Sequence, residues 1–357
     1  MHKKLFIPGP VEVYPDILKA MGTPMIGHRT KDYTDLHKRV KEKLQKFLYT
    51  QNKIFLSTSS GTGVMEACVR NCSNKAIASF PCGEFGERWY QIALANGKKA
   101  DAFPVELGKA IKPEMVDRVL ATGKYDAVLI THNETSVGVM NPLAEIAVVL
   151  KKYPEIVFLV DAVSAMAGVK IEVDQWGIDV CLASTQKGFA WPPGFAVFSV
   201  SPKALARARQ VPNRGYYFDF VEFEKFDEKN QTPTTPSVSH IFALDAQLDK
   251  FFKEGLDNRF ARHLKMAEIC RKWAKDNGFT LFPEPGYESI TMTTVNNIRN
   301  IDITKLNDEL AKKGFIISAG YGKLKDTTFR IAHMGDTTPD ELKELLVTIE
   351  SILHANA

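Results

Sequence analysis

Residues 157–194 constrain the fold of this chain most strongly, because they contain two short apolar runs that each lead into polar residues. The first run ends at Asp161, and the second starts at Asp179 and leads into Ser184-Thr185-Gln186-Lys187-Gly188. Apolar runs of this length, bounded by Gly, Asp and Ser, predict buried parallel strands. Open α/β sheets place their sites beyond the carboxyl ends of such strands. The segment therefore predicts that a carboxylate and an amine reach one crevice.

This carboxylate and amine have two interpretations. A lysine held against apolar surface loses its proton more easily and can attack a carbonyl, and a nearby carboxylate can keep a ring nitrogen protonated. That combination is typical of a pyridoxal phosphate site. Taken singly, however, an aspartate at a strand end is more often a cap or turn residue, and most lysines are solvated surface charges. The choice between a cofactor site and two unrelated residues therefore depends on the other motifs of the chain.

The composition indicates a globular protein that binds neither nucleic acid nor membrane. The chain has 357 residues, of which 45% are hydrophobic and 25% charged, enough for one large domain and a smaller one. Its net charge of +4 is spread along the chain, with no dense basic run. No stretch approaches the roughly 20 apolar residues that span a bilayer. The first apolar run meets Pro8-Gly9-Pro10 too early for a signal peptide, so we expect a cytoplasmic protein.

The cysteines predict no metal site. There are five, and only Cys68 and Cys72 share a helical face, while Cys82, Cys181 and Cys270 complete no ligand spacing. An odd, scattered set of thiols with apolar neighbours is typical of reduced core residues. This agrees with the cytoplasmic expectation.

Two glycine-containing segments follow further strand-like runs. Ser60-Gly61-Thr62-Gly63-Val64 opens a predicted helix, where free backbone N–H groups could receive a phosphate, although a capped helix without a ligand explains the pattern equally well. Phe85 lies between Gly83 and Gly86, which predicts a turn that could hold its ring over a flat ligand, although most such phenylalanines only pack. His28 and Arg29, after Gly27, are potential anion contacts whose role the sequence leaves open.

Strands alternating with helices predict an α/β fold with a mostly parallel, doubly wound sheet of the large domain. We expect three parts: an extended, proline-rich N-terminal arm over residues 1–15, a large domain over 16–255 and a small C-terminal α+β domain over 256–357. Residues 213–239 fit no regular element and predict a long ordered loop.

Taken in order, these motifs resemble the class V, fold type I, pyridoxal-phosphate aminotransferases, and among them the alanine/serine–glyoxylate (serine–pyruvate) group. The resemblance covers nearly the whole chain. It rests on P-G-P, G-H-R, S-G-T-G-x-x-E-A, G-x-F-G-E-R, T-H-N-E-T-S-x-G, V-D-A-V-S, S-T-Q-K-G, T-P-x-T-P-S and F-R-I-A-H-M-G. Each motif is weak alone, and their shared order is what carries the resemblance. It implies a seven-stranded sheet in the large domain.

The resemblance also implies a role for each site residue. Lys187 would hold the cofactor as a Schiff base and move the substrate proton, and Asp161 would pair with the ring nitrogen. Phe85 would stack on the ring, Val163 would pack beneath it, and Thr135 would contact its phenolic oxygen. Contacts to the cofactor phosphate would come from Thr62, Gly63, Val64 and Gln186, and from Thr235 of a second subunit in a homodimer with shared active sites. Arg330 would clamp the substrate carboxylate through two parallel hydrogen bonds.

Two positions depart from the pattern of relatives. Many relatives have a tryptophan where this chain has Phe85, which predicts weaker stacking on the ring. Thr232 stands where relatives can have a tyrosine in the phosphate loop, so Thr235 is the safer assignment for the contact from the second subunit.

We expect a ping-pong transamination in which alanine or serine gives its amino group to glyoxylate or pyruvate. The small residues around Gly9 suggest a short side-chain pocket. Aspartate or phosphoserine are alternative donors on the same scaffold. A cysteine desulfurase is disfavoured, because Gln186 precedes the lysine and no cysteine follows Cys270. A non-enzymatic phosphate binder would leave Lys187 and Arg330 without a role.

Overall fold

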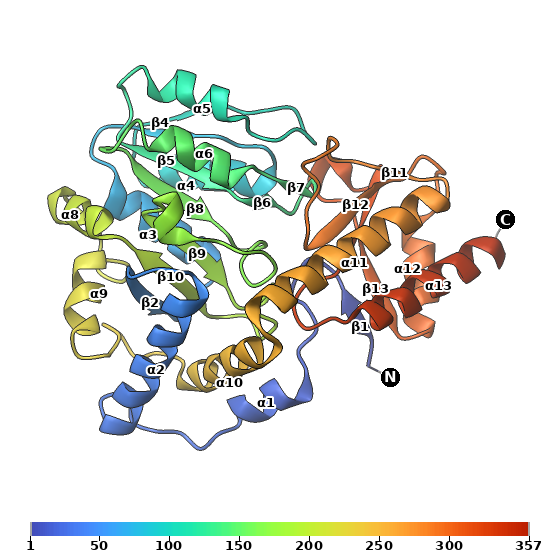
Figure 1. Cartoon of the computed structure of the whole chain (residues 1–357), viewed down its shortest axis with the longest axis horizontal. Helices are drawn as coiled ribbons and strands as arrows, with labels where there is room; N and C mark the ends of the chain where they lie inside the picture. Colours follow the sequence, from blue (N-terminus) through green and yellow to red (C-terminus); the bar gives the residue numbers. More distant parts are fainter. Residues whose placement is uncertain (1, 356–357) are drawn as a thin grey trace.

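A computed structural model describes residues 2–355 of the chain. Figure 1 shows a large sheet with helices on both faces and, beside it, a smaller part, built of a sheet and helices, that contains both ends of the described chain. The larger sheet has seven strands in the order β2-β10-β9-β8-β5-β3-β4, and β10 is its one antiparallel member. The strands are β2 (Lys53–Ser57), β3 (Ile77–Ser79), β4 (Ala100–Ala102), β5 (Ala127–Thr131), β8 (Val157–Asp161), β9 (Val180–Ser184) and β10 (Ala196–Val200).

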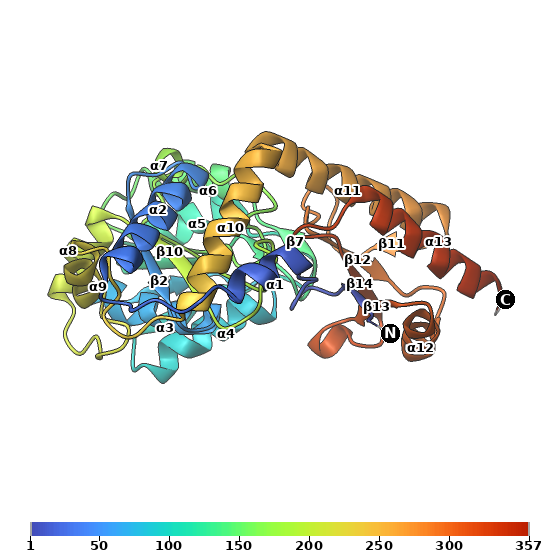
Figure 2. The ribbon, with the colours of Figure 1, turned by 90° about the horizontal axis from the view of Figure 1, so that it is seen from below.

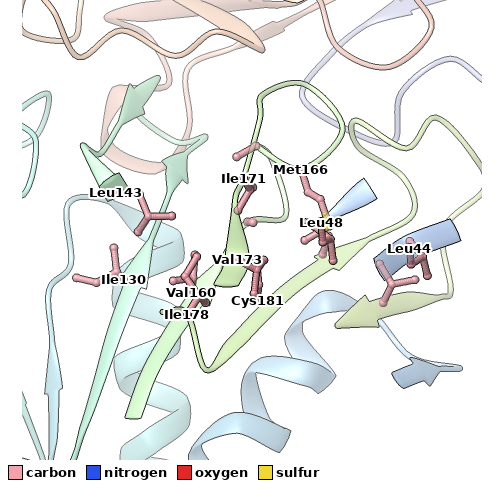
Figure 3. Close-up of a cluster of buried hydrophobic side chains, with 14 of the residues drawn as sticks. Leu44, Leu48, Ile130, Leu143, Val160, Met166, Ile171, Val173, Ile178 and Cys181 are labelled. Atoms are coloured by element: carbon pink, nitrogen blue, oxygen red, sulfur yellow. The ribbon is translucent and has the colours of Figure 1, made fainter. Parts of the chain in front are cut away.

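Side chains of these strands alternate between two hydrophobic cores, one on each face of the sheet. In β8, Phe158 and Val160 enter the first core, whereas Val157 and Leu159 enter the second. Figure 3 shows part of the first core, where Val160 and Ile130 of the sheet meet Leu143 and Ile178. Because both faces are covered, the central strands β5, β8, β9 and β10 are buried along their whole length, which is why they read as mostly apolar runs in the sequence.

Different helices cover the two faces, as Figure 2 shows. The first core is closed by α1 (Pro15–Met21), α2 (Lys31–Phe47), α5 (Pro113–Leu120), α6 (Leu143–Leu150), α7 (Val173–Trp176) and α10 (Val238–Glu254). The second is closed by α3 (Gly61–Cys72), α4 (Glu84–Ala95), α8 (Pro202–Gln210) and α9 (Phe220–Asp227). The mostly parallel, doubly wound sheet expected from the sequence is confirmed.

The smaller sheet has five strands in the order β1-β13-β14-β12-β11. These are β1 (Lys4–Phe6), β11 (Thr280–Leu281), β12 (Met292–Asn296), β13 (Phe315–Ala319) and β14 (Thr328–Ala332). Three helices share its core: α11 (Leu256–Asp276), α12 (Ile303–Lys312) and α13 (Pro339–Ala355). A β6–β7 hairpin (Asn133–Glu134 and Val139–Met140) and a 3₁₀ turn, η1 (Gly322–Leu324), face the junction of the two parts.

The N-terminal arm enters the smaller sheet. Its strand β1 pairs in parallel with β13, with Leu5 opposite Ile316, so residues from the two ends of the chain build one sheet. The arm then crosses to the larger sheet, where the Val11 N–H donates to the Gln186 carbonyl at 3.0 Å. The division into an arm and two domains at residues 15 and 255 stays our proposal.

The loop predicted for residues 213–239 is wrong. Residues 213–239 contain a helix, α9, and α10 begins at Val238 within the same segment. The Asp219 carboxylate caps α9 by accepting the Val221 N–H at 2.9 Å. Phe220 and Phe223, three residues apart, are buried in the second core. The helix was missed because only two of its apolar residues, Phe220 and Phe223, are spaced as on one buried helical face, within a segment rich in aromatic and acidic residues.

Candidate active site

A cavity of about 120 Å³ lies at the carboxyl ends of β8 and β9, where these strands meet the beginning of α3. It is lined by Ser60, Gly61, Thr62, Met65, Phe85, Arg88, Asn133, Thr135, Asp161, Val163, Ser164, Ser184, Gln186 and Lys187. Seven of the residues predicted from the sequence, Thr62, Phe85, Thr135, Asp161, Val163, Gln186 and Lys187, therefore line one cavity.

Lys187 lies three residues beyond the end of β9, and the N-terminal arm lies over it. The Lys187 ammonium donates a hydrogen bond to the Pro8 carbonyl. Burial and the neighbouring Arg330 guanidinium lower the pKa of Lys187 to about 8. A larger fraction of the amine is therefore neutral near pH 7 than for an ordinary lysine, and a neutral amine is the form that attacks a carbonyl.

Asp161 is the last residue of β8, and only 3% of its surface is exposed. Burial raises the pKa of its carboxyl to about 7, and the Val163 N–H, which donates at 2.9 Å, offsets part of this rise. A carboxylate in this position gains most from a cationic partner placed in the cavity. A protonated ring nitrogen is such a partner.

The beginning of α3 forms the opposite wall. Ser60 is the N-cap residue without a side-chain cap bond, and a Cβ atom on Gly61 would lie 2.9 Å from Val163 and 3.2 Å from the Ser184 hydroxyl. A glycine is therefore needed where the helix meets the sheet edge. Gly63 and Val64 do not line the cavity: the Gly63 N–H donates to the Ser60 carbonyl at 3.0 Å, and the Val64 side chain is buried in the core.

Phe85 belongs to the first turn of helix α4 and not to an isolated turn, which corrects the local structure expected for it. The buried carboxylate of Glu134 fixes this turn by accepting the Phe85 N–H at 3.1 Å and the Gly86 N–H at 3.0 Å. The Ser136 hydroxyl donates to the same carboxylate at 2.6 Å. Glu134 thus holds the Phe85 ring at the cavity, 6.0 Å from the Lys187 amine.

Polar groups of β6 and of the loop after β8 form the floor of the cavity. The Thr135 and Ser164 hydroxyls lie 2.6 Å apart. The Asn133 amide donates to the Ser164 carbonyl at 3.2 Å.

Arg330, on β14 of the smaller sheet, does not itself line the cavity, but it contacts the lining residue Thr135. Its guanidinium donates to the Ala319 and Thr135 carbonyls, each at 3.1 Å, and stands 5.4 Å from the centre of the Tyr321 ring. Burial lowers the pKa of Arg330 to about 10, so the group stays a cation at neutral pH. An arginine held by backbone carbonyls keeps its charge available for an anionic ligand.

Thr235 lies apart from the cavity of its own chain and is exposed. The Arg29 guanidinium binds the neighbouring loop, donating to the Thr232 carbonyl at 2.8 Å and the Pro233 carbonyl at 3.3 Å. Arg29 therefore holds the loop that carries Thr235. His28 is half-buried outside the cavity.

The cavity fits a phosphorylated aromatic aldehyde. Three buried polar atoms that line it, Ser184 Oγ, Gln186 Oε1 and Asn133 Oδ1, have no hydrogen-bond partner within residues 2–355. Buried polar atoms normally have partners, so these three are available for hydrogen bonds to a polar ligand in the cavity. Sequence reasoning did not single out Asn133, Ser164 or Ser184, nor Glu134, Arg88 and Tyr321, although most of them belong to the quoted motifs.

Within residues 2–355, no helix is long and apolar enough to cross a bilayer, and no cluster of three His, Cys, Asp or Glu side chains could hold a metal ion.

Known proteins match the chain along nearly its whole length. The family model described as aminotransferase class-V matches residues 12–328. An uncharacterized aminotransferase of Methanocaldococcus jannaschii is 39% identical over 99% of this chain and 93% of its own. A serine–glyoxylate aminotransferase of Methylorubrum extorquens is 31% identical over 93% of this chain and 86% of its own. The crystal structure of an alanine–glyoxylate aminotransferase from Nostoc sp. superposes with a TM-score of 0.93 at 26% identity, covering 99% of this chain and 96% of the other.

Proposed function

Because this chain belongs to the class-V aminotransferases, we propose that its amino donor is alanine or serine and its acceptor is glyoxylate or pyruvate. The protein is an enzyme that uses pyridoxal phosphate to move an amino group between a small amino acid and a 2-oxo acid. The observation that carries the proposal for the site is that a lysine with a lowered pKa and a buried carboxyl line the same cavity.

Lys187 and Asp161 are the proposed catalytic pair. When bound, pyridoxal phosphate supplies an aldehyde that takes up amines and a ring that accepts the electron pair left at the substrate Cα. The Lys187 amine would hold the cofactor and, when free, would take the substrate Cα proton and return it. The Asp161 carboxylate would keep the ring nitrogen protonated.

The other residues orient the reactants. Phe85 and Val163 would hold the cofactor ring between them, and Thr135 would contact its phenolic oxygen. Thr62 and Gln186, which line the cavity, would hold the phosphate at the beginning of α3, whereas Gly63 and Val64 lie outside the lining and are left out of the proposed contacts. Arg330 holds the substrate carboxylate, and the arm at Gly9 closes the cavity above Lys187.

We propose a homodimer in which Thr235 of one subunit reaches the cofactor phosphate of the other. The exposed position of Thr235, on a loop held by Arg29, supports this assignment. Native mass measurement tests the dimer, and Thr235→Ala should weaken cofactor retention without changing that mass. A monomer with full activity would overturn the proposal. A cytoplasmic location stays a prediction from the sequence.

Spectroscopy of the purified enzyme tests the proposed function. The wild-type protein should be yellow, lose its visible band on addition of alanine or serine, and regain it with glyoxylate or pyruvate. Lys187→Ala should abolish borohydride trapping of the cofactor and lower turnover by several orders of magnitude. Lys170→Ala, which removes a lysine outside this cavity, is the matched control. Colourless protein that traps no cofactor would refute the proposal.

Cysteine desulfuration remains disfavoured. The five cysteines are all buried, and the last of them, Cys270, is a residue of α11 in the core of the smaller part. Burial raises the pKa of the Cys270 thiol to about 12, so it is a poor nucleophile.

A further inference from the structure

Arg259 is a buried arginine near the beginning of α11, and it does not line the active-site cavity. Figure 1 shows that this end of α11 adjoins α10, whereas the rest of the helix runs along the smaller part. Only 1% of the Arg259 surface is exposed, and its guanidinium carbon lies 3.7 Å from the centre of the Phe251 ring. A charged group is stable in such a place only where its donors find partners.

The guanidinium makes five hydrogen bonds, as many as it has N–H donors. Its Nε donates to the Ala167 carbonyl at 2.9 Å. Its Nη2 donates to the Gly188 carbonyl at 2.9 Å and to the Gly335 carbonyl at 3.1 Å. Its Nη1 donates to the Glu254 and Asp336 carboxylates, each at 3.1 Å. The two carboxylates balance the charge, and the three carbonyls belong to three separate loops.

Each of these loops follows a strand that leads to the active site. Gly188 comes directly after Lys187. Ala167 lies on the loop after β8, the strand that ends at Asp161. Gly335 lies between β14, which carries the proposed substrate arginine, and α13. One side chain therefore joins the loops of all three groups that we expect to act on the cofactor and the substrate.

The loops after β8 and β9 are in tight contact where the guanidinium binds them. A Cβ atom on Gly188 would collide with the Met166 carbonyl oxygen. Ala167 has a φ of +69°, a left-handed conformation that a residue with a Cβ atom keeps only where its surroundings fix it. Both Ala167 and Gly188 are buried, so without Arg259 their carbonyls would lose these partners and the loops would have to shift to find others.

We propose that Arg259 is a positioning residue for the transamination, which fixes the backbone beside Lys187 relative to Asp161. This inference rests on the proposed function, in which these two residues act on one cofactor. The planar guanidinium reaches acceptors on several sides at once, and a lysine, with all its donors on one atom, cannot reproduce this. Stability alone is a weak explanation, because exchanging a buried ion pair for apolar groups is often neutral.

Two arginines of α11 allow a matched comparison. Arg262 shares the Glu254 carboxylate and the Gly335 carbonyl, but among the described residues it donates to none on the loops after β8 and β9. Arg259→Lys should lower kcat on the order of 100-fold, with a much smaller change in KM for the amino donor, because small displacements of a reacting group have large kinetic effects. Arg262→Met should lose its own ion pair while kcat stays near the wild-type value. Equal losses of kcat in the two variants would overturn the inference.

Hydrogen exchange of the cofactor-free protein gives a readout that needs no turnover. The backbone amides of residues 185–191 should exchange at least about tenfold faster in Arg259→Lys than in the wild type, because the loop opens locally, and at unchanged rates in Arg262→Met. The pH at which the visible band of the holoenzyme changes should also shift in Arg259→Lys alone. A loss of stability in Arg259→Lys with unchanged exchange of residues 185–191 would mean a merely structural role and would overturn the inference.

Chemical rescue provides a second variant. Arg259→Ala leaves a space of the shape of the lost group, so free guanidinium ion at concentrations too low to denature the protein should raise kcat and slow the exchange of residues 185–191. Sodium chloride at the same concentration should do neither. Rescue by both salts, or by neither, would contradict the assignment. Wild-type enzyme that reacts with no donor and shows no visible band would instead refute the proposed function, and the exchange experiment would still report on the loops.

Discussion

The side chain of Lys187 lies directly against Gly9. A Cβ atom on Gly9 would stand 2.7 Å from Lys187 Cδ and 2.8 Å from both Cε and Nζ, closer than carbon atoms approach in folded proteins. Gly9 also has a φ of +114°, which side chains other than that of glycine rarely allow. The N-terminal arm is therefore in tight contact with the Lys187 side chain, and only a glycine fits at position 9.

Gly9→Ala should displace either the arm or Lys187. We expect the visible band to weaken and turnover to fall by at least about tenfold, since small displacements of a reacting group have large kinetic effects. The control is Gly286→Ala, at a glycine with φ of +90° and open space around it, which introduces backbone strain without a clash. Equal activity of the two variants would contradict the role assigned to the contact.

Asp161→Asn should change how stability depends on pH in the cofactor-free protein. Burial raises the pKa of Asp161 from 3.8 to about 7, so between these values the folded protein binds more protons than the unfolded chain. The free energy of unfolding must then fall as pH rises through this window, by about 1.4 kcal/mol per pH unit for this group. The asparagine cannot ionise and should lose that slope. Urea unfolding at about pH 5 and about pH 7 measures it.

The same substitution should impair catalysis, because asparagine cannot hold a ring nitrogen protonated. Asp161→Asn would then be more stable than the wild type without cofactor near neutral pH and much less active with it. Parallel slopes for the two proteins would contradict the raised pKa.

Glu134→Gln should loosen the beginning of α4. The carboxylate accepts the Phe85, Gly86 and Ser136 N–H groups and the Ser136 hydroxyl, and an amide offers only one acceptor oxygen to these donors. We expect a loss of about 1–3 kcal/mol in unfolding free energy for each buried donor left without a partner, together with weaker cofactor binding. Ser136→Ala removes one of the four donors and should cost less. Cofactor titration and urea unfolding distinguish the two variants.

Arg330→Lys should impair substrate binding and turnover while the protein stays yellow. A lysine keeps the charge but cannot offer two parallel hydrogen bonds to a carboxylate. It would also lose the bonds to the Ala319 and Thr135 carbonyls. The cofactor band and the rate of each half-reaction measure the two effects separately. Loss of the cofactor instead would show that Arg330 does not serve the substrate.

The main sheet could be predicted from the sequence because its strands are buried on both faces. Asp161 ends β8 and Lys187 lies three residues beyond β9, so the pairing of these two strands brings both residues to one cavity. The helix α9 could not be predicted in the same way, since only Phe220 and Phe223 mark its buried side. A buried strand can be recognised from a run of about five apolar residues. A short helix with only two buried apolar residues has no such run and resembles an irregular segment.

Contacts between segments that are distant in the sequence could not be predicted either. Glu134 was visible only as one letter of a motif, and nothing in its neighbourhood indicates that it binds the backbone of α4. The pairing of Leu5 with Ile316 joins residues from opposite ends of the chain, and local patterns carry no information about such partners. The link between Arg88 and Tyr321 is of the same kind.

The N-terminal arm connects the position of the smaller sheet to the proton affinity of the Lys187 amine. Strand β1 is paired with β13 of the smaller sheet, and Pro8, two residues after its end, accepts the hydrogen bond of the Lys187 ammonium. A tilt of the smaller sheet would therefore lengthen or restore that bond and shift the proton affinity of the amine. The orientation of the smaller sheet and the fraction of Lys187 in its neutral, nucleophilic form would then change together.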